Sequence, residues 1–162
     1  MEGVAIRAAD GKELDAVLDM YEWLLEPPGS TPASWARGRA RRALAEAIEG
    51  ADTTILVADA GAEGLAGFVS AYLDLNSVRF GLRCWVEDLA VDRARRSAGI
   101  GAELLQAAKA WAREHGATHL ELDTAIARVD AQRFYERHGY TSIEPDRNER
   151  AFYFFRELQP PT

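Results

Sequence analysis

Apolar residues recur at helical spacing in four stretches of the chain and alternate, or run together, in seven others. The first helix is expected from about Lys12, capped by Asp10, and it ends at a proline-glycine segment, residues 26–30. A second helix is expected from the Thr31-Pro32 pair, with Leu44 and Ile48 facing inward. The remaining helices are predicted from the glycine turn at 99–101 to about residue 115, and over residues 129–138.

The strands are predicted from short runs that are rich in β-branched, aromatic and alternating apolar residues. They cover residues 4–7, 53–58, 65–73, 82–91, 119–124, 140–143 and 151–158. The runs 53–58 and 65–73 are joined by a polar turn and are expected to form an antiparallel hairpin, whereas residues 74–77 break the pattern. Gly116 and Gly139 are expected to end their helices, and residues 159–162 are expected to form a loose tail. The order of elements predicts an α/β chain with a mixed sheet.

Composition and charge restrict the partners that this chain is expected to have. Its 162 residues suit one domain, and 48% of them are hydrophobic, which is enough for a substantial core. The net charge of −7 argues against nonspecific binding to nucleic acid and favours cationic small molecules. The sequence shows no run of the roughly 20 apolar residues that span a bilayer and no signal-peptide pattern, so no membrane partner is expected. The single cysteine, Cys84, is typical of a reducing compartment and, together with these features, favours a cytoplasmic location.

The most informative stretch is residues 86–105, which is expected to form a strand, a basic turn and the start of a helix. Two carboxylates, Glu87 and Asp88, lie on the strand, and two glycines lie in the turn. The first N–H groups of a helix lack partners, and the helix dipole there is positive, so the turn is a candidate anion site. A dinucleotide fingerprint would need a small residue where Leu104 stands, and a P-loop would need a Lys-Ser or Lys-Thr pair, so both interpretations fail.

Two segments carry a resemblance to a known family. The turn Arg96-Ser97-Ala98-Gly99-Ile100-Gly101 resembles the Arg/Gln-x-x-Gly-x-Gly/Ala signature of the GNAT superfamily of acetyl-CoA-dependent N-acetyltransferases. About thirty residues later, the run 131–140, AQRFYERHGY, is similar to the second motif of that family. The resemblance implies a single-domain fold over residues 1–162. It predicts a mixed, mostly antiparallel sheet of about seven strands, four helices, and a splay between strands 4 and 5.

The resemblance also implies a division of labour along the chain. Residues 83–140 would form the cofactor core, and the helices at about 10–50 would form the acceptor side. Acetyl-CoA would bind through its pyrophosphate at the helix start and through its pantetheine arm along the fourth strand. The implied cofactor-binding residues are Leu89, Ala90, Val91, Arg96, Ser97, Ala98, Gly99, Ile100, Gly101 and Ala102. No metal is implied, because the three histidines (His115, His119 and His138) lack metal-ligand spacing.

Acyl transfer to an amine needs the neutral amine. A lysine-like amine with a pKa of ~10.4 is deprotonated only about once in 2,500 at pH 7, so a base or a water must take its proton. The resemblance assigns the acid that protonates the departing thiolate to Tyr135, and Glu87 to the base or to a substrate anchor. Regular strand alternation would place Glu87 and Asp88 on opposite faces. Arg128 stands where the family often has an asparagine, so the contact that this asparagine makes with the cofactor is not expected here.

Three functions follow from these observations. The first is transfer of an acetyl group to the primary amine of a cationic small molecule, polyamine-like or aminoglycoside-like, suggested by Glu87, Asp88 and Asp74. The second is acetylation of a protein N-terminus or lysine, and the third is an acyl-CoA-binding sensor without turnover. The expected partner is a small-molecule amine acceptor, and a homodimer is left open.

Overall fold

The structure is a computed structural model that describes residues 3–27, 29–78, 81–124 and 128–141. The chain divides into two compact units, residues 1–127 and residues 128–162. The strands are β1 (Ala5–Ala8), β2 (Thr53–Asp59), β3 (Leu65–Ser77), β4 (Gly81–Val91) and β5 (His119–Leu122). The helices are α1 (Leu14–Leu25), α2 (Arg37–Glu49), α3 (Ile100–Glu114) and α4 (Val129–Arg137), with short 3₁₀ turns at 11–13, 61–63 and 93–95.

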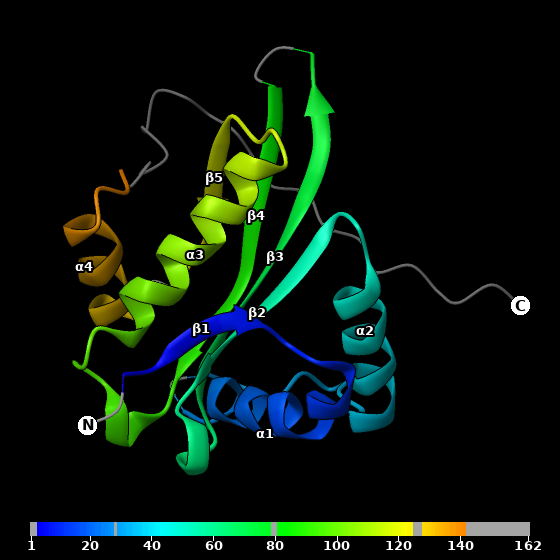
Figure 1. Cartoon of the computed structure of the whole chain (residues 1–162), viewed down its shortest axis with the longest axis vertical. Helices are drawn as coiled ribbons and strands as arrows, with labels where there is room; N and C mark the ends of the chain where they lie inside the picture. The colour runs from blue at the N-terminus through cyan, green and yellow to red at the C-terminus, as the bar shows by residue number, and fades with distance from the viewer. Residues whose placement is uncertain (1–2, 28, 79–80, 125–127, 142–162) are drawn as a thin grey trace, which may run out of the picture. The chain divides into compact units, whose positions relative to one another are not determined.

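The first unit is built on a sheet in which the five strands lie in the order of the sequence (Figure 1). The pairs β1–β2, β2–β3 and β3–β4 are antiparallel, and β4–β5 is parallel. The β4–β5 pairing runs only from Arg83–His119 to Val86–Leu122. Since β4 continues to Val91, its last five residues extend beyond β5. At this end β4 pairs with β3 but not with β5, which corresponds to the predicted splay between strands 4 and 5.

Helices cover both faces of this sheet. Helices α1 and α2 pack against one face, where Val57 and Phe68 are fully buried among residues of α1. Helix α3 packs against the other face, where Gly67 of β3 lies so close to β4 that a Cβ would come within 2.6 Å of the Ala90 carbonyl oxygen. Leu104 of α3 lies over the same glycine. The predicted α/β fold with a mixed sheet is therefore confirmed.

The start of the first helix follows the predicted cap. The Asp10 side chain accepts a hydrogen bond from the Lys12 N–H, and Glu13 bonds back to the Asp10 N–H, so the two residues form a capping box. Arg7 on β1 bridges Glu13 and Asp59, at 2.7 and 2.8 Å, and joins β1, the first turn and β2. Helix α1 ends at Leu25, before the proline segment as predicted.

Three predictions about the elements need correction. Thr31-Pro32 does not start a helix: the Trp35 N–H bonds the Pro32 carbonyl in a tight turn, Ala36 is extended, and α2 begins at Arg37. Residues 74–77 do not end the third strand, because β3 continues through an irregularity between Leu73 and Asn76. Five strands are present among the described residues, and Tyr140 and Thr141, the described half of the predicted strand 140–143, are not part of a strand.

The last two predicted strands are not among those five. Tyr140 and Thr141 are not in a strand, and the rest of the predicted strand 140–143, the whole of 151–158 and the tail 159–162 lie outside the described residues. Gly116 and Gly139 both have a φ of +82°, which confirms their predicted role at the helix ends. Among the described residues, no helix has the length and apolar character needed to cross a bilayer.

Candidate functional site

A β-bulge at Glu87 shapes the centre of the first unit. On β4, Asp88 pairs with Ser70, whereas Val86 pairs with Ala71, the next residue along β3. Glu87 is therefore an extra residue on β4 without a partner of its own in the register. Bulges of this kind change the direction in which the following side chains point.

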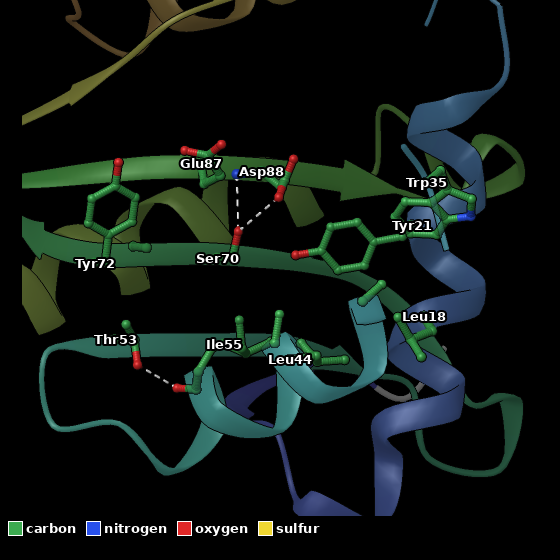
Figure 2. A pocket seen from close by; sticks show the side chains of 14 residues that line it. Leu18, Tyr21, Trp35, Leu44, Thr53, Ile55, Ser70, Tyr72, Glu87 and Asp88 are labelled. Carbon is green, nitrogen blue, oxygen red and sulfur yellow. Dashed lines mark hydrogen bonds between the residues drawn. The ribbon is translucent and has the colours of Figure 1, made fainter. Parts of the chain in front are cut away.

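The bulge overturns the prediction that Glu87 and Asp88 lie on opposite faces. Tyr72 and Ser70 lie on the α1/α2 face of β3, and their partners on β4 are Trp85 and Asp88. Regular alternation from Trp85 would place Glu87 on this face and Asp88 on the other one. The extra residue turns Asp88 back, so that both carboxylates face helices α1 and α2, as Figure 2 shows.

Asp88 is the half-buried member of this pair. Its backbone N–H donates to Ser70 Oγ at 3.1 Å, and Ser70 Oγ lies 3.3 Å from Asp88 Oδ2, to which it donates. Burial, together with the nearby Glu87 carboxylate, raises the pKa of Asp88 above its ordinary value, and hydrogen bonding to Tyr21 and Ser70 acts in the opposite direction. Burial also raises the pKa of the Tyr21 hydroxyl, so this group stays protonated at neutral pH.

Glu87 is exposed and is held by its neighbour on the same face. The Trp85 indole N–H donates to Glu87 Oε2 at 2.9 Å, and the Arg83 guanidinium lies 5.5 Å from the centre of the Trp85 ring. Arg83 also forms ion pairs with Asp74 and Glu121. Asp74 is thus neutralised by Arg83 and does not line the cavity below, which corrects its predicted role in attracting a cationic acceptor.

The two carboxylates lie at one end of a cavity of about 280 Å³ between the sheet and helices α1 and α2. Figure 2 shows Glu87 and Asp88 together at this end, with Ile55 and Leu44 across the cavity from them. The lining residues come from α1, the turn before α2, α2, β2, β3 and β4: Leu18, Tyr21, Trp35, Ala40, Ala43, Leu44, Ala47, Thr53, Ile55, Ser70, Ala71, Tyr72, Glu87 and Asp88. Tyr21 and Trp35 both line this cavity.

The turn before α3 has the geometry of an anion site. Gly99 caps the helix with a φ of +85°, and Ser97 is the one described non-glycine residue with a positive φ, +69°. Within the described chain, the N–H groups of Ser97, Gly99, Ile100 and Gly101 donate to no protein acceptor. The N–H groups of the other two predicted residues, Ala98 and Ala102, bond the carbonyls of Arg95 and Gly99. Four unpartnered donors at a helix N-terminus fit a pyrophosphate.

The arginines of this turn have different environments. Arg93 and Arg95 pair with Glu26 and Glu63, at 3.3 and 3.0 Å. Arg96 is exposed and forms no ion pair with a described residue, so its charge is available to a ligand. This arrangement favours Arg96 over Arg95 as the side chain that contacts an anion.

The strand end next to the turn offers a second cofactor surface. Leu89, Ala90 and Val91 pair with Val69, Phe68 and Gly67 of β3 on one edge, and β5 does not reach their other edge. An extended ligand can pair with such an edge through backbone groups, as a peptide does in β-augmentation. The role of these three residues in holding the cofactor stays a prediction.

Tyr135 belongs to the second unit, on α4. Its ring packs edge-on against Phe134, with centroids 5.3 Å apart, and against Tyr140, at 6.0 Å. Arg128 precedes α4 and its carbonyl accepts the Gln132 N–H. Arg133 and Arg137 are exposed.

Cys84 and the three histidines have structural surroundings. Cys84 is fully buried, and burial raises the pKa of its thiol to about 11, so this thiol is unreactive at neutral pH. His115 and His138 each contact the carbonyl of the fourth residue before them, and His119 lies 3.1 Å from Glu121.

Comparison with known proteins gives this geometry a family. The description "Acetyltransferase (GNAT) family" matches residues 17–140, more than half of the chain. This chain belongs to the GNAT family of acetyltransferases. The match includes the turn at 96–101 and α4, so the predicted resemblance is confirmed in both of its segments.

Several relatives of this GNAT chain are named for acetyl transfer. An uncharacterised N-acetyltransferase of Bacillus subtilis, YhfO, is 34% identical over 93 residues, which are 57% of this chain and 62% of that protein. A streptothricin acetyltransferase of Streptomyces lavendulae is 38% identical over 94 residues, 57% of this chain and 47% of that protein. These matches thus span only about half to three fifths of each relative. An aminoglycoside N-acetyltransferase, AAC(6')-Iy, whose structure was solved in complex with CoA, shares the fold with a TM-score of 0.77, at 16% identity over 96% of this chain and 95% of that one.

Sequence reasoning singled out Glu87 and Asp88 in this GNAT chain but not how the two carboxylates meet. Ser70, which ties Asp88 to β3, was missed because a serine inside an apolar strand carries no signal of its own. The bulge was missed as well, since the sequence 82–91 reads as a regular strand.

Proposed function

We propose that this protein transfers an acetyl group from acetyl-CoA to the primary amine of a small cationic molecule. The observation that carries the proposal is the bulge at Glu87. Because of it, the side chains of Glu87 and Asp88 both face one cavity, next to the end of β4 that β5 does not cover. Family membership and the unpartnered N–H groups before α3 support acetyl-CoA as the other substrate. The relative that acts on streptothricin supports an amine acceptor of small size.

The site residues take the following roles in this proposal. The N–H groups at Ser97, Gly99, Ile100 and Gly101, together with Arg96, hold the pyrophosphate, and the outer edge of Leu89, Ala90 and Val91 pairs with the pantetheine arm. Ala98 and Ala102 line the same turn. Acetyl-CoA brings the acetyl group as a thioester, which a neutral amine nitrogen can attack.

Glu87 and Asp88 bind the acceptor amine and take part in its deprotonation. Both attract an ammonium ion, but a neighbouring carboxylate also raises the pKa of that ammonium and opposes its deprotonation. Exposed Glu87 can pass the proton to solvent through a water, whereas half-buried Asp88 cannot release it as readily. We therefore assign proton removal to Glu87 through a water, and positioning of the amine to Asp88. When the N–C bond forms and the C–S bond breaks, the nitrogen loses its second proton to the same water, and Tyr135 protonates the departing thiolate. The Tyr135 phenolate then regains a proton from solvent.

The remaining expectations stay predictions. A single acetyltransferase domain over residues 1–162, with a cofactor core at 83–140 and acceptor-side helices at 10–50, is consistent with the cavity lying between α1, α2 and the sheet. A cytoplasmic location and a homodimer are not tested by the geometry.

A steady-state assay tests the proposal. Free thiol released from acetyl-CoA is followed with a panel of polyamines, aminoglycosides, simple alkylamines and short peptides with a free N-terminus. Release that depends on a small amine is expected. Tight CoA binding without release for any acceptor would instead indicate a sensor, and release with peptides alone would indicate a protein acetyltransferase.

A further inference from the structure

The cavity beside Glu87 and Asp88 is charged at one end and mostly apolar over the rest of its wall. At the polar end the two carboxylates meet Ser70, and at the other end Leu44 and Ile55 face them across the cavity (Figure 2). The helix α2 contributes only apolar side chains to the lining, namely Ala40, Ala43, Leu44 and Ala47. A ligand that fills this space therefore meets charge at one end and hydrocarbon along its length.

Three of the four hydroxyl groups in the described lining are already engaged by the protein. Thr53 Oγ1 donates to the Ala47 carbonyl at 2.6 Å, Ser70 Oγ donates to Asp88, and the Tyr21 hydroxyl hydrogen-bonds with Ser70 and Asp88. The fourth is the hydroxyl of Tyr72. A polyhydroxylated acceptor would have to leave most of its own hydroxyl groups without partners against α2 and β2, which costs free energy for each group. An apolar body suffers no such penalty and gains from leaving water.

We propose that the acceptor is a primary amine with an alkyl or aryl body, bound with its ammonium group between Glu87 and Asp88 and its apolar part against α2. This inference rests on the proposed acetyl transfer and narrows its acceptor class. Two carboxylates supply complementarity to one cation, and the described lining residues include no third carboxylate that could hold a second cation at a distance. The cavity volume of about 280 Å³ accommodates a body of the size of a phenylethyl or hexyl group.

The first test compares acceptors that all carry a primary amine and differ in the body. The kcat/KM for acetyl-CoA-dependent thiol release is measured with hexylamine and 2-phenylethylamine, against ethanolamine, spermidine and the aminoglycoside kanamycin. Each methylene or ring that fills an apolar pocket changes kcat/KM by about tenfold or more, so the two apolar amines are expected to exceed ethanolamine by at least about 100-fold. A preference for spermidine or kanamycin would overturn the inference while leaving acetyl transfer intact.

A pair of matched variants locates the preference in the cavity. Ala43→Phe fills the space from an exposed position of α2, and Ala110→Phe adds the same ring at an exposed position of α3, on the opposite side of the sheet. The first variant is expected to lower kcat/KM for 2-phenylethylamine by more than tenfold and to affect ethanolamine less; the second is expected to change neither. Equal effects of the two variants, or an equal loss for both amines in Ala43→Phe, would contradict the placement of the apolar body.

Equilibrium binding separates this inference from the proposed function. Calorimetric titration of the full chain with hexylamine and ethanolamine needs no turnover. Tighter binding of hexylamine than of ethanolamine, without acetylation of either, would support the apolar acceptor site and contradict the proposed acetyl transfer. Acetylation of both amines with equal affinities and equal kcat/KM would support the activity and sink the inference.

Discussion

Glu87 and Asp88 are consecutive residues on one strand, and yet both side chains face the same cavity. The cause is the unpaired position of Glu87 in the register of β3 and β4, which turns Asp88 onto the face that Trp85 and Glu87 share. The two carboxylates then differ in environment, since Glu87 is exposed and bound by the Trp85 indole, whereas Asp88 is half-buried and bound by Ser70. The predictions below separate their roles.

Asp88→Asn tests the positioning of the amine. Loss of the negative charge is expected to raise KM for the amine by about 10- to 150-fold, the range for hydrogen bonds to charged groups, with CoA affinity unchanged. Glu114→Gln, which removes an exposed carboxylate at the end of α3, serves as the control and is expected to leave KM unchanged. An unchanged KM for Asp88→Asn would remove Asp88 from acceptor binding.

The same variant has an expected effect on stability. Folding raises the pKa of Asp88, so the folded chain binds more protons than the unfolded chain between the unfolded and the folded pKa. The contribution of Asp88 to the free energy of unfolding is therefore lost as pH rises from the unfolded pKa through the folded pKa. The asparagine side chain does not titrate, so the Tm of Asp88→Asn at neutral pH is expected to be no lower than that of the wild type. A clearly lower Tm would show that the carboxylate stabilises the fold.

Much of the secondary structure could be predicted from the sequence because its signals are local. Asp10 with Glu13 marks a helix start, and Gly116 and Gly139 mark helix ends, whatever lies around them. Residues 74–77 were misread because their composition suggests a break, while pairing with β4 keeps the chain extended. The Thr31-Pro32 pair was misread because the same pair can also form a tight turn, which it does here with Trp35.

The candidate site depends more on contacts that are distant in sequence. The anion turn at 96–101 is a contiguous motif, and so it was visible. The common face of Glu87 and Asp88 depends on how β4 pairs with β3, and the half-burial of Asp88 depends on Tyr21 and Ser70, 67 and 18 positions away. No local pattern in residues 82–91 carries that information.

Ser70→Ala tests the tie between β3 and Asp88. The hydroxyl stabilises the ionised carboxylate, so its removal is expected to raise the pKa of Asp88 further. The acid limb of kcat/KM, where ionised Asp88 is lost, should then move to higher pH. The measurement is the pH profile with a saturating concentration of acetyl-CoA. A limb that stays in place would show that Asp88 does not control it.

Gly101→Glu tests the anion site before α3. A carboxylate beside the unpartnered N–H groups would repel a pyrophosphate, and CoA affinity is expected to fall more than about tenfold. Ala110→Glu adds the same charge to an exposed position of the same helix and should bind CoA normally. Calorimetric titration with CoA measures both. If Gly101→Glu is folded and binds CoA as the wild type does, the pyrophosphate lies elsewhere.

Tyr135→Phe tests the assigned acid. Without the phenol, kcat is expected to fall by about 100-fold or more, the usual contribution of general acid catalysis, while CoA affinity stays the same. Tyr140→Phe removes the hydroxyl from the aromatic residue that packs against Tyr135 and serves as the control. Unchanged kcat in Tyr135→Phe would assign thiolate protonation to another group or to water.

The most direct test of the central claim is product analysis with isotopically labelled acetyl-CoA and a primary amine such as 2-phenylethylamine. The account predicts that the label appears as an amide on the amine nitrogen with the wild type. With Glu87→Gln/Asp88→Asn it should be nearly absent, although this variant still binds CoA. Label transfer by the double variant at the wild-type rate, or no transfer by the wild type to any amine, would contradict the claim that these two carboxylates and their cavity form the acceptor site.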